Sequence, residues 1–141
     1  MEVQKGRGYV YAIQYHLVWC VKYRKKLLHG DIEQRLKEML REQSKTHGFR
    51  IVTMETDQDH VHMFIECSPQ HFIPSIMKAL KGNTARFLLK EFPTLKKELW
   101  DGHLWSPSYF VCTVSDRTEE QIKAYIENQQ TKARPVGRPK E

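Results

Sequence analysis

The alternation of side chains over residues 9–21 constrains the fold of this chain more than any other feature. Every second residue of this segment is apolar or aromatic: Tyr9, Tyr11, Ile13, Tyr15, Leu17, Trp19 and Val21. Aromatic and β-branched residues at a period of two are typical of a strand with one buried face. The sequence therefore predicts one long strand over 9–21 with a strongly apolar face.

Helical and strand patterns alternate along the rest of the chain. They predict a helix between Asp31 and Gly48, a hairpin of strands 49–55 and 61–67, a helix over 72–91, a strand region over 104–114 and a last helix over 119–132. The order β-α-β-β-α-β-α predicts an α+β, ferredoxin-like (RRM-like) antiparallel sheet with helices on one face and one extra C-terminal helix.

Three local signals indicate how these helices begin or bend. Asp31 is the predicted N-cap of the first helix, and Thr118 opens a capping-box pattern before the last one. Gly82-Asn83 predicts a bend in the second helix, or its division into two.

Length and composition fit one globular domain with a basic surface. The 141 residues carry a net charge of +6, which favours polyanionic partners. We expect one domain over 1–133, followed by a basic, flexible tail over 134–141 that is rich in Pro and Gly. Three widely spaced cysteines without a CxxC pair indicate reduced thiols. With no signal peptide and no apolar run of membrane-spanning length, we expect a cytoplasmic protein without a membrane partner.

His60-Val61-His62 is the sharpest local motif. Residues i and i+2 of a strand point to the same face, roughly 6.5–7 Å apart, so these two imidazoles can share one metal ion while Val61 is anchored in the core. The triplet alone is a weak signal, and by itself it favours two surface or core histidines that happen to alternate. Asp59 either orients a ligand or belongs only to the preceding turn, and we favour the turn. Among the other histidines only His16 stands out, because it lies within the first strand.

Tyr125 and Gln129 form a second candidate pair. At i and i+4 of the last helix they are neighbours on one face. A phenol can act as a nucleophile towards phosphorus, and an amide oxygen is an acceptable ligand for a divalent ion. The ordinary alternative is an amphipathic helix whose tyrosine packs against the sheet.

Basic residues gather in two places that are candidate contacts for DNA. The denser cluster has an interleaved aromatic residue and comprises Lys22, Tyr23, Arg24, Lys25 and Lys26. The second is a stripe on the predicted helix over 72–91 and comprises Lys78, Lys81 and Arg86.

Five ordered segments resemble a known family. These are YHLVWCVKYRKK, DHVHMFIE, SIMKALKGNTAR, LWSPSYFV and YIENQ. Together they resemble the single-tyrosine transposases of the insertion-sequence 200/605 family, which belong to the HUH (histidine–hydrophobe–histidine) nucleases. The resemblance covers roughly residues 9–131.

The resemblance implies a dimeric DNA transposase that cuts and rejoins single-stranded DNA at hairpin-bearing ends. It implies that His60 and His62 are metal ligands, that Tyr125 is the nucleophile forming a 5′-phosphotyrosine intermediate, and that Gln129 is the third ligand. The ion that we expect is Mg²⁺ or Mn²⁺. The resemblance also implies that the tyrosine helix can complete the partner subunit's site in a homodimer, that is, in trans.

The alternative is a non-catalytic, single-stranded nucleic-acid-binding domain of the same ferredoxin-like fold. It explains the basic charge and the tyrosine-rich first strand. It leaves the histidine pair, Tyr125 and Gln129 as coincidences.

Overall fold

The protein is built on a four-stranded antiparallel sheet. A computed structural model describes residues 4–6, 9–11, 13–114 and 117–129. The strand order is β4-β5-β3-β6, with β3 (Ile13–Cys20), β4 (Arg50–Thr56), β5 (His60–Cys67) and β6 (Phe110–Cys112). The central strands are β3 and β5, which are the first and third strands of this sheet along the chain. This is the ferredoxin-like strand order.

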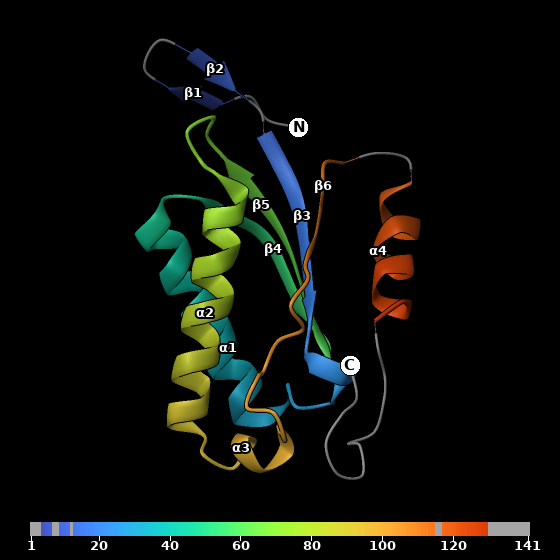
Figure 1. Cartoon of the computed structure of the whole chain (residues 1–141). Helices are drawn as coiled ribbons and strands as arrows, with labels where there is room; N and C mark the ends of the chain where they lie inside the picture. Colours follow the sequence, from blue (N-terminus) through green and yellow to red (C-terminus); the bar gives the residue numbers. More distant parts are fainter. Residues whose placement is uncertain (1–3, 7–8, 12, 115–116, 130–141) are drawn as a thin grey trace.

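Helices cover both faces of this sheet. Figure 1 shows α1 (Gly30–His47) and α2 (Ile73–Glu91) on one face and α4 (Thr118–Glu127) on the other. Two short helices, η1 (Lys22–Arg24) and α3 (Leu95–Glu98), lie in the connections. The predicted fold class, with its extra C-terminal helix, is confirmed.

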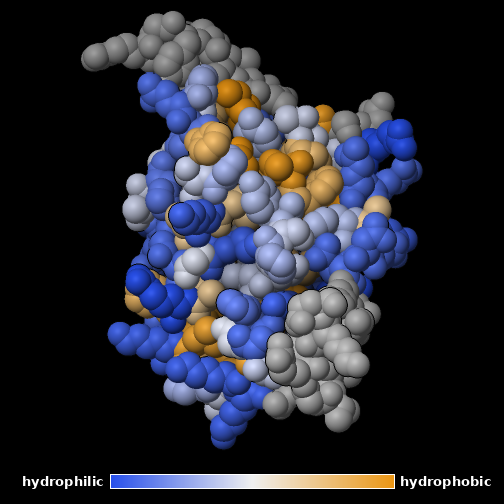
Figure 2. Space-filling model, in the orientation of Figure 1, coloured by the Kyte–Doolittle hydropathy of each residue, from blue (hydrophilic) through white to orange (hydrophobic). Residues whose placement is uncertain are grey.

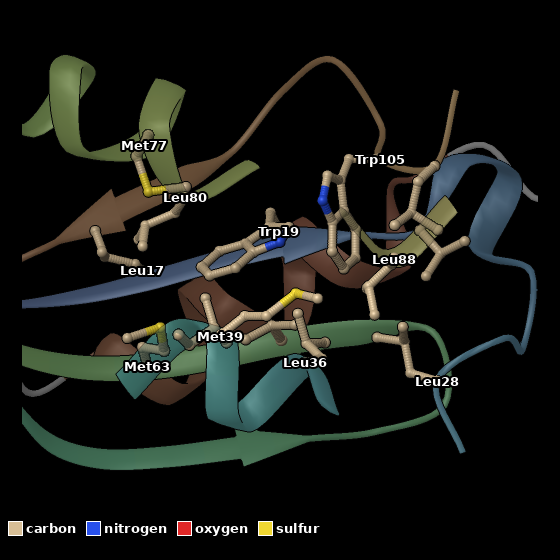
Figure 3. Close-up of a cluster of buried hydrophobic side chains, with 14 of the residues drawn as sticks. Leu17, Trp19, Leu28, Leu36, Met39, Met63, Met77, Leu80, Leu88 and Trp105 are labelled. Carbon is tan, nitrogen blue, oxygen red and sulfur yellow. The ribbon is translucent and has the colours of Figure 1, made fainter. Parts of the chain in front are cut away.

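The core lies between the sheet and the α1–α2 layer (Figure 3). Alternate residues of the two central strands, among them Leu17 and Trp19 of β3 and Met63 of β5, are completely buried there. Trp105 packs edge-on against Trp19, with ring centroids 6.0 Å apart and planes at 83°. Its Nε1 donates a hydrogen bond of 3.0 Å to Oγ1 of Thr84 in α2, so the buried indole nitrogen is satisfied.

The prediction of one strand over 9–21 is wrong in its extent. Ile13 pairs with Cys67, the last residue of β5, so the main sheet offers no further hydrogen-bonding partner beyond that point. Residues 9–11 instead form β2 (Tyr9–Tyr11), which pairs with β1 (Gln4–Gly6) in a separate two-stranded sheet.

The predicted hairpin forms, whereas the predicted strand region over 104–114 is mostly loop. Thr56 pairs with Val61 across the tight turn between β4 and β5. Within 104–114 only β6 and a single bridge from Trp105 to Val21 have strand pairing.

Three predictions about helix ends and bends are corrected. Helix α2 runs without interruption through Gly82, and neither Asp31 nor Thr118 caps a helix with its side chain. The N-cap positions belong to His29 and Arg117 instead. The Thr118 hydroxyl, already inside α4, donates back to the carbonyl of Thr113 at 3.4 Å.

The three cysteines are free thiols, as expected. Cys20 and Cys67 are buried, and burial raises the pKa of Cys20 to about 12. Hydrophilic residues cover most of the face in Figure 2. No helix in the described residues is long and apolar enough to cross a membrane. The predicted tail over 134–141 lies outside the described residues.

Two glycines provide a matched test of this backbone. Gly48 ends α1 with φ = +78°, a left-handed conformation that strains an L side chain, whereas Gly82 lies within α2 with no atom within 4 Å of an added Cβ. We expect Gly48→Ala to lower the free energy of unfolding by about 1 kcal/mol and Gly82→Ala to raise it by about 0.5–1 kcal/mol. Urea unfolding at one fixed protein concentration measures both. A loss of stability in Gly82→Ala would contradict the uninterrupted helix.

Candidate active site

The histidine pair lies on the sheet face opposite the core. In β5 the buried residues Val61 and Met63 point towards α1 and α2, so the alternation turns His60 and His62 towards the α4 side. The position predicted for Val61 in the core is thereby confirmed, since its exposed fraction is 0%.

A cavity of about 770 Å³ lies beside the two histidines. Part of its wall comes from α4, through charged side chains at four-residue spacing: Glu119, Lys123 and Glu127. The rest of its charged wall comes from the sheet and its loops: Arg24, Lys26, Glu55, Asp57 and Asp59. The charged stripe of α4 was missed in the sequence, although its i, i+4 spacing places it on one helix face.

His60 is held by Asp59, which belongs to a partly buried ion pair with Arg24. The Asp59 side chain lies 2.8 Å from His60 through Oδ1 and Nδ1, and Arg24 donates from Nε to its other oxygen at 3.2 Å. Burial opposes ionisation of Asp59, but the hydrogen bonds from His60 and Arg24 outweigh it and lower the pKa of this carboxyl. The carboxylate therefore accepts from Nδ1–H of His60 and leaves Nε2 of that ring for a ligand. Treating Asp59 as a turn residue alone was wrong.

A strained loop brings Arg24 to this position. Tyr23 and Arg24 have φ values of 60° and 53°, a conformation that non-glycine residues rarely adopt. Such backbone strain persists only where the surroundings fix it, and it often accompanies functional sites.

His62 contacts a third histidine. Its Nε2 lies 2.8 Å from Nδ1 of His16 on β3, and the His16 ring stacks on Phe64 with centroids 4.5 Å apart and planes at 13°. Burial lowers the pKa of both imidazoles from the ordinary value of 6.5, so both are neutral at pH 7.

Tyr125 lies on the side of α4 that faces the segment before β6. Helix α4 ends at Glu127, earlier than predicted, so Gln129 lies just beyond it, beside the same segment. The Tyr125 hydroxyl is 2.8 Å from the Ser108 hydroxyl, and its ring lies 5.7 Å from that of Phe110. The Gln129 side-chain oxygen accepts from the Ser106 hydroxyl at 3.1 Å. Burial raises the pKa of Tyr125, although the Ser108 hydrogen bond acts against it, so the phenol is protonated here.

The four candidate residues thus form two separate pairs within one chain. His60 and His62 line the 770 Å³ cavity, and neither Tyr125 nor Gln129 lines it. The two serines that hold the second pair were not recognised in the sequence, because no spacing rule connects them with a helix some twenty residues further on.

The histidine side of the cavity has the chemistry of a cation site. Among the described residues, Asp57, Asp59 and His60 present ligand atoms that all lie within 4.8 Å of one another. His60 and His62 each have one ring nitrogen held by a neighbouring side chain, which is the arrangement usual for metal-ligating histidines. These donor types fit a divalent metal, although the group of ligand atoms within 4.8 Å does not include His62.

Most of the first basic cluster has partners inside the protein. Lys22 forms an ion pair of 2.6 Å with Asp101, and Lys25 donates to a backbone carbonyl of α3. The Tyr23 ring stacks on Trp100 at 5.8 Å. Lys26 is exposed at the rim of the cavity.

The second basic group does not form one stripe. Lys78 and Arg86 are exposed on α2, with Arg86 above the ring of Phe87. Lys81 turns inwards, and its ammonium donates to the carbonyls of Ser106 at 2.7 Å and Ser108 at 3.0 Å. It therefore braces the same segment that holds Tyr125 and Gln129.

Comparison with known proteins identifies the family. The family described as IS200-like transposases matches residues 9–129, and this chain belongs to it. The chain is therefore a transposase. It is 48% identical over 132 residues to the ISDra2 transposase TnpA of Deinococcus radiodurans, covering 94% of each chain. It is 32% identical over 116 residues to the transposase for insertion sequence element IS200 of Salmonella typhimurium, covering 82% of this chain and 76% of that one.

Solved structures agree with the fold. A crystal structure of a Deinococcus radiodurans R1 protein described as a transposase superposes with a TM-score of 0.87 at 46% identity, over 92% of this chain and 99% of that one. A REP-associated tyrosine transposase bound to a REP hairpin has a TM-score of 0.55 at 12% identity, over 80% of this chain and 64% of that one. The second similarity concerns the fold alone.

The inward position of Lys81 leads to a stability test with a neighbour as control. We expect Lys81→Met to lower the free energy of unfolding by about 1.5–3 kcal/mol, because the two carbonyls lose a charged donor. Lys78→Met, one turn earlier on the exposed face, is expected to change it by less than about 0.5 kcal/mol. Equal changes in the free energy of unfolding for the two variants, measured by urea unfolding, would show that the Lys81 hydrogen bonds do not contribute to stability.

Proposed function

We propose that this transposase cuts and rejoins single-stranded DNA with Tyr125 as the nucleophile and a divalent ion bound by His60 and His62. The observation that carries the proposal is the arrangement of the two imidazoles. Each has one ring nitrogen engaged by a neighbouring side chain and one left over, on a face that opens into a charged cavity beside α4.

The chemistry needs no other reactant. The Tyr125 phenol gives up its proton as its oxygen attacks the scissile phosphorus, so that a bond from phosphorus to the phenolic oxygen forms and the bond to the 3′ oxygen breaks. The 3′ oxygen takes up a proton and leaves as a hydroxyl, and the DNA remains joined to the protein as a 5′-phosphotyrosine. Attack of a 3′-hydroxyl on this linkage reverses the step, so rejoining consumes no nucleotide triphosphate.

The ion would be held by His60, His62 and the Gln129 side-chain oxygen, and Mg²⁺ or Mn²⁺ is the expected species. When bound, it supplies positive charge to the non-bridging phosphate oxygens, where negative charge increases in the transition state. The Asp59–Arg24 pair fixes the His60 ring for this task.

The protein is proposed to act as a homodimer with its active sites completed in trans. Within one chain, Tyr125 is hydrogen-bonded to Ser108 and Gln129 is hydrogen-bonded to Ser106. Neither Tyr125 nor Gln129 lines the histidine cavity. Release of α4 from these two serines would free both side chains to enter the partner subunit's cavity. The burial that raises the pKa of Tyr125 is removed by the same step.

The proposed substrate is single-stranded DNA with a hairpin near the cut. The fold is similar to that of a transposase solved with a REP hairpin, and the surface is basic. Lys26, Lys78 and Arg86 are the predicted DNA contacts that remain exposed. Lys22, Tyr23, Arg24, Lys25 and Lys81, which have partners inside the protein, stay predictions that require those contacts to change. The expected location is the cytoplasm, where such DNA is present.

Tyr125→Phe tests the nucleophile directly. Incubation with a pool of labelled, hairpin-bearing single strands and Mg²⁺ is expected to give a covalent protein–DNA adduct on a denaturing gel. The adduct should be absent in EDTA and in Tyr125→Phe, and present in Tyr109→Phe, which removes a hydroxyl from the loop just before β6. Tight DNA binding without any adduct would favour the non-catalytic binding domain, and an adduct in Tyr125→Phe would reassign the nucleophile.

Mixing two inactive variants tests the trans arrangement. Subunits of Tyr125→Phe and of the double variant His60→Ala/His62→Ala are exchanged and then given DNA. Sites completed in trans should restore up to about a quarter of the wild-type adduct, because random exchange makes half of the dimers mixed and each of these has one complete site. Sites completed within one chain predict no adduct in the mixture, since neither subunit then has both parts.

A further inference from the structure

The third histidine on the α4 face of the sheet is not explained by the function proposed above. His16 lies on β3, opposite Phe64 in the register of β3 and β5, and Val18 lies opposite His62. His16 and His62 are therefore diagonal neighbours on adjacent strands, close enough for ring-to-ring contact. The 2.8 Å between Nδ1 of His16 and Nε2 of His62 is a hydrogen-bond distance.

The direction of this hydrogen bond decides whether His62 can bind metal. A neutral imidazole has one N–H and one nitrogen lone pair. If His16 donated to Nε2 of His62, the His62 proton would lie on Nδ1 and neither nitrogen would have a lone pair left for an ion. If His62 donates from Nε2–H, its Nδ1 keeps a free lone pair.

We propose that His16 is the positioning residue of His62: its Nδ1 accepts the Nε2–H of His62 and thereby fixes the ring and the tautomer in which His62 ligates through Nδ1. The inference rests on the metal site of the proposed function and names a residue that acts through its ligand. His16 has the same role for His62 that Asp59 has for His60. The contacted nitrogen differs: it is Nε2 in His62 and Nδ1 in His60.

The surroundings of His16 suit an acceptor in a fixed orientation. Its ring is stacked on Phe64, nearly parallel at 13°, and it belongs to a central strand paired on both sides, with β5 and with β6. A neutral acceptor also adds no negative charge beside His62. The two ligands therefore differ, because His60 is paired with a carboxylate and His62 with an imidazole.

His16 is a positioning residue in this arrangement rather than a further ligand. The facing nitrogens, Nδ1 of His16 and Nε2 of His62, are 2.8 Å apart, which is a direct hydrogen-bond distance. A neutral His16 ring that accepts at Nδ1 has its proton on Nε2, so it has no lone pair left to bind an ion.

Two variants of His16 distinguish its role as a hydrogen-bond acceptor from the stacking of its ring on Phe64. His16→Phe keeps an aromatic ring against Phe64 and removes the acceptor, whereas His16→Asn places an amide oxygen near the former Nδ1. Calorimetric titration with Mn²⁺ is expected to show about a 10–100-fold loss of affinity in His16→Phe and at least partial recovery in His16→Asn. Unchanged affinity in a folded His16→Phe would overturn the proposal, as would an equal loss in both variants.

The tautomer of His62 can also be measured in the metal-free wild-type protein. This measurement tests the proposal even if a His16 variant fails to fold. Nitrogen-15 NMR of the histidine rings is expected to find His62 protonated at Nε2 and unprotonated at Nδ1. A proton on Nδ1 of His62 would overturn the proposal. A wild-type protein with the expected tautomer and His16-dependent Mn²⁺ affinity, but no tyrosine adduct, would refute the proposed reaction while supporting the role of His16.

Discussion

The two-residue period of β5 is the constraint on which the rest of the site depends. Burying Val61, Met63 and Ile65 against α1 and α2 turns every intervening side chain to the opposite face. His60 and His62 are therefore rigidly placed by the same packing that stabilises the core. A slip of one residue in register would bury both imidazoles and expose the core residues, so the proposed metal ligands and the fold are specified together.

Neighbouring elements then determine what each imidazole can do. The hairpin turn supplies Asp59 to His60, and β3 supplies His16 to His62. Arg24 reaches Asp59 from η1, where two consecutive residues, Tyr23 and Arg24, adopt left-handed backbone angles. The histidine side of the site is thus supported by Asp59, the sequence neighbour of His60, and by two residues distant in sequence, His16 of β3 and Arg24 of η1.

The tyrosine side is held differently. Helix α4 contacts the sheet mainly along β6, and its polar anchors are two serine hydroxyls in a loop that is itself braced by Lys81. Hydrogen bonds of this kind contribute about 1 kcal/mol each, far less than the packing that fixes β5. A helix with such attachments is suited to the proposed role of Tyr125, which would leave its position in one chain and enter the partner subunit's site.

By itself the sequence determined the order of the elements, the buried face of each central strand, and the candidate residues of the site. These are local properties, because periodicity and i, i+2 or i, i+4 spacing depend only on neighbouring residues. It did not determine where β3 begins, since that depends on the length of its partner β5, or that α2 passes through Gly82 despite the weak helix preference of glycine.

Only the tertiary structure decided which side chains meet. It gave Asp59 a role beyond the turn, turned Lys81 inwards to support a loop, and set Tyr125 and Gln129 apart from the histidines. It also brought His16 to His62, a contact between residues 46 positions apart. Such contacts are set by strand register and by the seating of one helix on a sheet. Both depend on how the whole chain packs, and no spacing within a single segment contains that information.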